Sequence, residues 1–130
     1  MTMTGWILAV LALHFVQTYL PSTVRALSRD EVQKRYLRGP RDEVPPAGLM
    51  VGRMERALKN LMESLPIFIT LALLAEIRGL TEGWALTGAM VFTLARVAYV
   101  PAYGSGIPWL RSAVWSVGFA GLVMMAVGVV

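Results

Sequence analysis

The chain of 130 residues contains no cysteine. This absence excludes disulfides, thiolate nucleophiles and thiolate metal sites, so any reactive thiol would have to arrive with a ligand, and we predict no metal site. Charge is also scarce, because charged residues make up 15% of the chain against roughly 25% in soluble domains. The stretch from Ala113 to Val130 has no ionisable side chain at all. Such a composition argues against water as the solvent of most of the chain.

Apolar residues are correspondingly abundant, at 56% against roughly 45–50% in soluble domains. They gather in four long stretches, Gly5 to Leu20, Leu65 to Leu80, Trp84 to Pro101 and Ala113 to Val130. A bilayer core about 30 Å thick is crossed by roughly 20 helical residues, a length that the last two stretches reach directly and the first two reach with their flanks. We therefore predict an all-α integral membrane four-helix bundle.

We expect a single domain over residues 1–130, with helices over about 4–27, 48–79, 82–103 and 108–130. Gly79 is placed to cap the second of these helices, and Pro108 suits the first turn of the last. In the first helix, His14 and Gln17 are three residues apart and share a face, which predicts a buried polar contact between helices.

The connection after the first helix has a structure of its own. Ser28 followed by Glu31 resembles a capping box, which predicts a short amphipathic helix through Arg38. The segment 39–48 contains three prolines and is predicted to be a loop that leads into the second long helix near Ala47 to Leu49.

The net charge of +4 and the pI of about 10.0 have a membrane explanation rather than a nucleic-acid one. The bases gather in the first connection and at the start of the next helix: Arg25, Arg29, Lys34, Arg35, Arg38, Arg41, Arg53, Arg56 and Lys59. Because basic connections stay on the cytoplasmic side, we predict that this connection is cytoplasmic and that both termini are outside.

Two groups of polar residues recur at helical spacing near this predicted cytoplasmic side. Arg56, Asn60 and Glu63 share one face of the second long helix, either as a buried ion pair and amide or as a site for an anionic or zwitterionic ligand. Arg96, with Tyr99 and Tyr103, forms a similar stripe on the third, where tyrosines alone could be interface residues.

A third polar element, Arg111 and Ser112, opens the last helix after a glycine-rich turn. Its alternative interpretation is an arginine that extends toward the membrane boundary. If the three elements meet, they offer several cations, a carboxylate, an amide and two phenols at one end of the bundle.

These residues resemble the MAPEG family, the membrane-associated proteins in eicosanoid and glutathione metabolism, over nearly the whole chain. The chain looks like the bacterial members of similar length and resembles the microsomal glutathione transferases. The segments that carry the resemblance are Glu55-Arg56-Ala57 with Asn60, Glu63 and Pro66-Ile67-Phe68, then Ala95-Arg96-Val97-Ala98-Tyr99 with Tyr103, Gly106-Ile107-Pro108 and Leu110-Arg111-Ser112.

The resemblance implies a homotrimer in a bacterial inner membrane, with glutathione as co-substrate held between neighbouring subunits near the cytoplasmic side. It assigns glutathione binding to Arg56, Asn60, Glu63, Arg96, Tyr99 and Tyr103. It also implies that Arg111 stabilises the glutathione thiolate, with Ser112 beside it in a catalytic position.

Three function classes follow. The first is a membrane-bound glutathione transferase, or a glutathione-dependent peroxidase, acting on hydrophobic electrophiles that partition from the bilayer. The second is a non-catalytic membrane protein of the same fold that binds lipid or small molecules. The third, a small exporter, is disfavoured because proton coupling needs an ionisable residue at mid-membrane depth, and the first helix offers only His14.

Overall fold

The computed structural model describes residues 1–28, 30–45 and 48–130, and they are organised as helices. The helices are α1 (Met3–Leu27), α2 (Glu31–Arg38), α3 (Leu49–Ile77), α4 (Trp84–Ser105) and α5 (Pro108–Val129). Four of them, α1, α3, α4 and α5, are each long enough and apolar enough to cross a membrane. The prediction of an all-α four-helix membrane bundle is confirmed.

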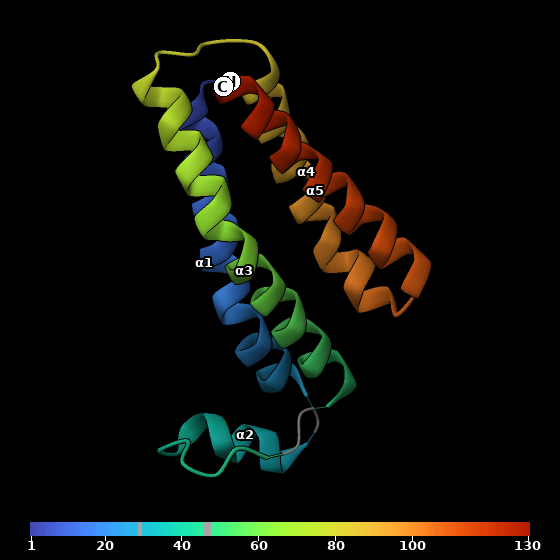
Figure 1. The fold of residues 1–130 in the computed structure, drawn as a ribbon. Coiled ribbons are helices and arrows are strands. Elements are labelled where there is room, and N and C mark those ends of the chain that lie inside the picture. The colour runs from blue at the N-terminus through green and yellow to red at the C-terminus, as the bar shows by residue number, and fades with distance from the viewer. Residues whose placement is uncertain (29, 46–47) are drawn as a thin grey trace.

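The long helices form two antiparallel pairs, α1 with α3 and α4 with α5 (Figure 1). Both termini lie at one end of the bundle, and the short α2 lies across the opposite end (Figure 1). The turn between α4 and α5 is also at the α2 end. This topology brings the basic first connection and the start of α5 to the same end of the molecule.

The helix ends follow the local sequence chemistry, and the Gly79 prediction is confirmed. Gly79 has a φ of 68°, which is costly for residues with a side chain, and its N–H donates to the Glu76 carbonyl at 3.0 Å. The N–H of Leu80 donates to the Ala75 carbonyl at 3.0 Å, completing a Schellman motif. The next helix begins at Trp84, slightly later than predicted, because Gly83 still has a non-helical φ of 94°.

The predicted capping box at Ser28 is wrong by two residues. Asp30 is the N-cap of α2, and its carboxylate accepts the Val32 N–H at 2.9 Å. Ser28 ends α1 instead, and its hydroxyl accepts the Asp30 N–H at 3.0 Å. The predicted short helix itself is confirmed, ending at Arg38. In the predicted loop, residues 39–45 and Gly48 lie outside helices, whereas residues 46–47, including the predicted start at Ala47, are outside the described residues.

A buried cation holds α2 against the bundle. Arg25, at the end of α1, is 3% exposed and donates to the Gln33 side chain on α2 and to the Glu55 carboxylate on α3, the latter at 3.2 Å. Its guanidinium also lies 4.9 Å from the centroid of the Tyr36 ring. A buried arginine is tolerated because these partners satisfy it, and in return it ties three helices together.

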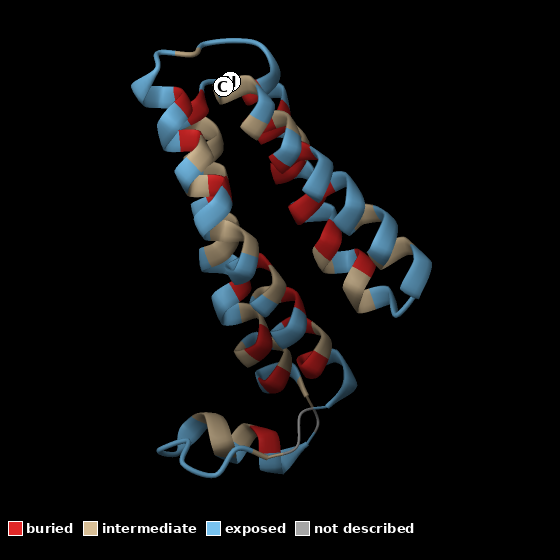
Figure 2. Cartoon of the chain, viewed as in Figure 1, coloured by how far each residue is buried: buried red, intermediate tan, exposed pale blue. Residues whose placement is uncertain are grey.

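The packed core lies toward the end with the termini. Phe68 of α3 stacks on Phe92 of α4, with ring centroids 4.8 Å apart, and Val10 and Met125 add contacts from α1 and α5. Of the two residues predicted to make a buried polar contact, Gln17 is buried, at 2% exposed, but its Oε1 has no hydrogen-bond partner among the described residues, and His14 is only half-buried. Exposed residues lie along the outer sides of the helices (Figure 2) and include many large apolar side chains, as expected of a lipid-facing surface.

Glycines let α4 and α5 approach each other closely. A Cβ added to Gly121 would lie 2.6 Å from the Phe92 nitrogen, and one added to Gly88 would lie 2.5 Å from the Gly121 carbonyl oxygen. The obstructing atoms are backbone and cannot move aside. In a bilayer the lipid tails are as apolar as the helix surfaces, so the hydrophobic effect does not bring helices together. Small residues are common at helix contacts there because they let the backbones pack closely.

We predict that Gly121→Ala destabilises the protein by about 1–3 kcal/mol, because the added methyl group forces the α4 and α5 backbones apart. Gly118→Ala is the matched control on the same helix, since its Cβ would meet the Ala95 side chain at an ordinary 3.6 Å. Thermal unfolding in detergent measures both. Equal melting temperatures for the two variants would contradict the close-packing account.

Candidate functional site

The candidate site lies at the α2 end of the bundle, where predicted residues from three helices meet. Asn60 and Arg56 come from α3, Tyr103 from the last turns of α4, and Arg111 from the first turn of α5. Hydrogen bonds and arginine–aromatic contacts join these side chains, with Arg96 and Tyr99, into one cluster. The predicted convergence of three separate sequence elements is therefore a property of the fold.

Arg96 is the centre of the cluster. Its side chain is 3% exposed, its Nη1 donates to Asn60 Oδ1 at 2.7 Å, and its guanidinium lies 4.4 Å from the centroid of the Tyr99 ring. The Nε and Nη2 atoms are buried and have no hydrogen-bond partner among the described residues. A buried guanidinium with unused donors is costly, so it is suited to receive an anionic or carbonyl group from a ligand.

Tyr103 connects the two other arginines. Arg56 Nε donates to the Tyr103 hydroxyl at 3.0 Å, and the Arg111 guanidinium lies 5.1 Å from the centroid of the same ring. The Tyr103 and Tyr99 rings meet edge to face with centroids 5.6 Å apart. Each tyrosine therefore contacts an arginine. Tyrosines that serve only as membrane-interface residues would not need these contacts.

Two predicted residues stand apart from these contacts. Glu63 is exposed and forms no ion pair with any described residue, so Arg56 does not act as its partner. Of the predicted lock between helices, the amide contact is present, because Asn60 joins α3 to Arg96 of α4. Ser112 is exposed, and none of the hydrogen bonds in the described part of the chain joins its hydroxyl to the cluster.

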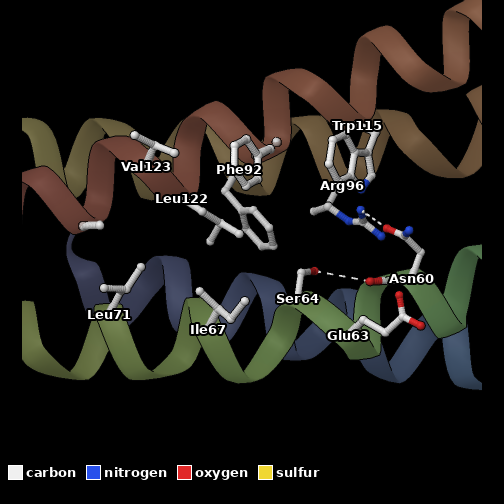
Figure 3. Close-up of a pocket in the computed structure, with 13 residues that line it drawn as sticks. Asn60, Glu63, Ser64, Ile67, Leu71, Phe92, Arg96, Trp115, Leu122 and Val123 are labelled. Atoms are coloured by element: carbon white, nitrogen blue, oxygen red, sulfur yellow. Dashed lines mark hydrogen bonds between the residues drawn. The ribbon is translucent and has the colours of Figure 1, made fainter.

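A groove of about 400 Å³ between α3 and α5 begins at this cluster (Figure 3). Its polar end contains Asn60, Ser64 and the Arg96 guanidinium, with Glu63 at the edge. The remainder is apolar and is lined by Ile67, Leu71, Phe92, Trp115, Leu122 and Val123. The groove therefore places a lipophilic surface directly beside a buried cation.

Sequence reasoning missed this groove. Trp115, Phe119 and Leu122 repeat at helical spacing on α5, and Trp115 stacks on Phe119 with centroids 5.6 Å apart. That periodicity was the available signal, but in a helix that is apolar all round it does not indicate which face packs against α3. No group of three or more His, Cys, Asp or Glu residues that could hold a metal ion lies within residues 1–28, 30–45 and 48–130.

Comparison with known proteins adds one finding. The model of the MAPEG family matches residues 3–130. The chain belongs to the MAPEG family. No curated protein and no solved structure matches it. MAPEG proteins include glutathione transferases and other members, so membership supports the membrane bundle and does not show a specific activity.

We predict that Asn60→Ala destabilises the protein by about 1–3 kcal/mol, because it leaves the buried Arg96 guanidinium without a hydrogen-bonded partner. Ser64→Ala is the control one turn further along α3, since among the described residues the Ser64 hydroxyl bonds to carbonyls of its own helix, those of Asn60 and Leu61. Thermal unfolding without added ligand tests this. An Asn60→Ala variant as stable as Ser64→Ala would argue against the Arg96–Asn60 bond.

Proposed function

We propose that the protein is a membrane-bound glutathione transferase acting on hydrophobic electrophiles. The observation that carries the proposal is the cluster of Arg56, Arg96 and Arg111 around two tyrosines, at the mouth of an apolar groove. Glutathione has two carboxylates, an ammonium group and a thiol, so a site for it needs several cations and one carboxylate. The cluster and Glu63 supply both kinds of group.

The buried Arg96 is suited to bind a carboxylate or carbonyl oxygen of glutathione through its two unused nitrogen atoms. Arg56 is exposed and offers a second cation, while Asn60 and the tyrosine hydroxyls add neutral hydrogen bonds. Glu63 has no cation partner among the described residues and would pair with the ammonium group. In this arrangement each charged group of the tripeptide meets an opposite charge.

Arg111 would stabilise the ionised thiol. A free thiol has a pKa of about 8.5 and is mostly protonated at neutral pH, and a nearby cation lowers that pKa and raises the fraction of reactive thiolate. Arg111 is half-buried above the Tyr103 ring, so its charge is only partly screened by solvent. Ser112, in the next position, is proposed as a hydroxyl donor to the same sulfur.

The apolar groove would hold the electrophile. A lipophilic compound dissolved in the bilayer can enter between α3 and α5 and lie along Ile67, Leu122 and Val123, with its reactive carbon near the Arg96 end (Figure 3). Glutathione would arrive from the aqueous side. A water-soluble and a membrane-soluble reactant would then be held side by side at the membrane boundary, so that they react within one site.

The proposal includes a homotrimer and an orientation in the bacterial inner membrane. Arg56 and Glu63 are exposed in a single subunit, and a neighbouring subunit would cover them and complete the glutathione site. The basic connection containing α2 would be cytoplasmic, with both termini outside, because the bases concentrate at that end.

The alternative is a non-catalytic MAPEG protein that binds lipid or a small molecule. The observation in its favour is the groove itself, which is mostly apolar and could hold a ligand without any activated thiol. Calorimetric titration with glutathione followed by a conjugation assay separates the two functions. Binding together with turnover supports the transferase, whereas binding without turnover supports the alternative.

We predict that Arg111→Ala lowers the thiolate absorbance of bound glutathione and reduces turnover by about 10²-fold or more, because the cation that stabilises the sulfur is lost. Stability should change by about 1 kcal/mol or less, the size of one cation–π contact. Arg111→Lys, which keeps the charge, is the control and should retain part of the signal. Thiolate absorbance equal to that of the wild type would exclude this role for Arg111.

We predict that Glu63→Gln weakens glutathione binding about 10- to 100-fold, the equivalent of one hydrogen bond to a charged group at about 1.5–3 kcal/mol, or weakens the trimer. Glu82→Gln, in the turn at the opposite end of the bundle, removes the same charge away from the site. Calorimetry and size measurement by light scattering test both effects. An unchanged dissociation constant and oligomer size would rule out both roles.

A further inference from the structure

Arg53, one of the basic residues near the predicted cytoplasmic side, also makes a specific contact between α3 and α4. Its Nη1 donates to the carbonyl oxygen of Gly104, in the last turn of α4, at 2.8 Å. The last carbonyls of a helix have no partner within the helix, and the C-terminal end of the helix dipole favours a cation. Arg53 thus caps α4 from a neighbouring helix.

The guanidinium of Arg53 also fills the space beside Gly106. This glycine ends α4 with a φ of 74°, and a Cβ added to it would lie 2.5 Å from Arg53 Nη2. The left-handed backbone favours glycine at this position, and a Cβ added there would displace the guanidinium. Arg53 is seated against both the last turn of α4 and the turn into α5.

The turn that Arg53 contacts lies between two residues of the candidate site. Tyr103 directly precedes Gly104, and Arg111 lies in the first turn of α5, where its N–H donates to the Ile107 carbonyl at 3.2 Å. Because these segments are short and helical, a shift of the turn would move the Tyr103 ring and the Arg111 guanidinium together.

We infer that Arg53 is a positioning residue, which holds the Gly104 carbonyl and thereby sets the placement of Tyr103 and Arg111 in the site. The inference rests on the proposed function, because the placement matters for the glutathione thiolate. Arg53 does not touch the thiol in this scheme; it acts through the α4–α5 turn.

The test combines a structural and a chemical measurement on the full-length protein in detergent. Arg53→Met should raise amide hydrogen exchange in residues 104–112 about tenfold and lower the thiolate absorbance with glutathione severalfold, because the turn loses its cap. Arg53→Lys keeps a cationic donor and should recover most of both signals. Arg35→Met removes an exposed cation from α2 at the same end and should change neither.

A pair of glycine variants tests the same contact from the other side. Gly106→Ala and Gly79→Ala place alanine at similar φ values, 74° and 68°, but a Cβ at Gly79 has nothing within 4 Å. Gly106→Ala should therefore perturb residues 104–112 and the thiolate signal, whereas Gly79→Ala should not. In an Arg53→Met background the part of the Gly106→Ala effect that comes from the guanidinium should disappear.

Three results would overturn the inference. Unchanged exchange in Arg53→Met would show that the cap is not needed, and increased exchange with an unchanged thiolate signal would reduce Arg53 to a structural role. Equal effects of Gly106→Ala with and without Arg53 would show that the two do not interact. Should Arg53→Met fail to fold, Arg53→Gln carries the same comparison. If wild-type protein gives no thiolate signal, the proposed function fails, while hydrogen exchange still decides whether Arg53 caps α4.

Discussion

The arrangement of the site depends on a charge buried between helices. Arg96 is the single charged residue of α4, a helix long and apolar enough to cross a membrane, where an arginine without partners would be expensive. Its hydrogen bond to Asn60 joins α4 to α3. The Tyr99 ring covers one face of the guanidinium. Two of the Arg96 nitrogen atoms have no hydrogen-bond partner among the described residues, and Arg96 lines the polar end of the groove, so the residue that joins the helices retains unused donors beside it.

The rest of the bundle supports this interaction by fixing the two helix pairs separately. Gly88 and Gly121 let the α4 and α5 backbones come close, so the pair behaves as one packed unit. Arg25 joins α1, α2 and α3 at the same end as the site. The hydrogen bonds from Arg96 to Asn60 and from Arg53 to Gly104 then link one pair to the other.

This organisation suits chemistry between a polar and a lipophilic reactant. The cations and phenols lie at the end of the bundle that carries the basic connection, and the apolar groove runs from them along α3 and α5. Membership in the MAPEG family agrees with such a design without naming the reaction. Under the proposed function, charge would select glutathione, while solubility in the bilayer would select the electrophile.

The sequence by itself determined that the chain has four apolar helices suited to a membrane and where these helices approximately end. Hydropathy is read from each segment alone, and Gly79 and Pro108 act on the helix ends beside them. It also placed Arg96, Tyr99 and Tyr103 on one stripe, since helical spacing is a local property. Only the tertiary structure decided that Arg96 bonds to Asn60 and that Glu63 forms no ion pair with the residues that the structure describes. The groove and the Arg53 cap likewise depend on which faces of α3, α4 and α5 pack together, and helices that are apolar on nearly every side carry no local signal for that choice.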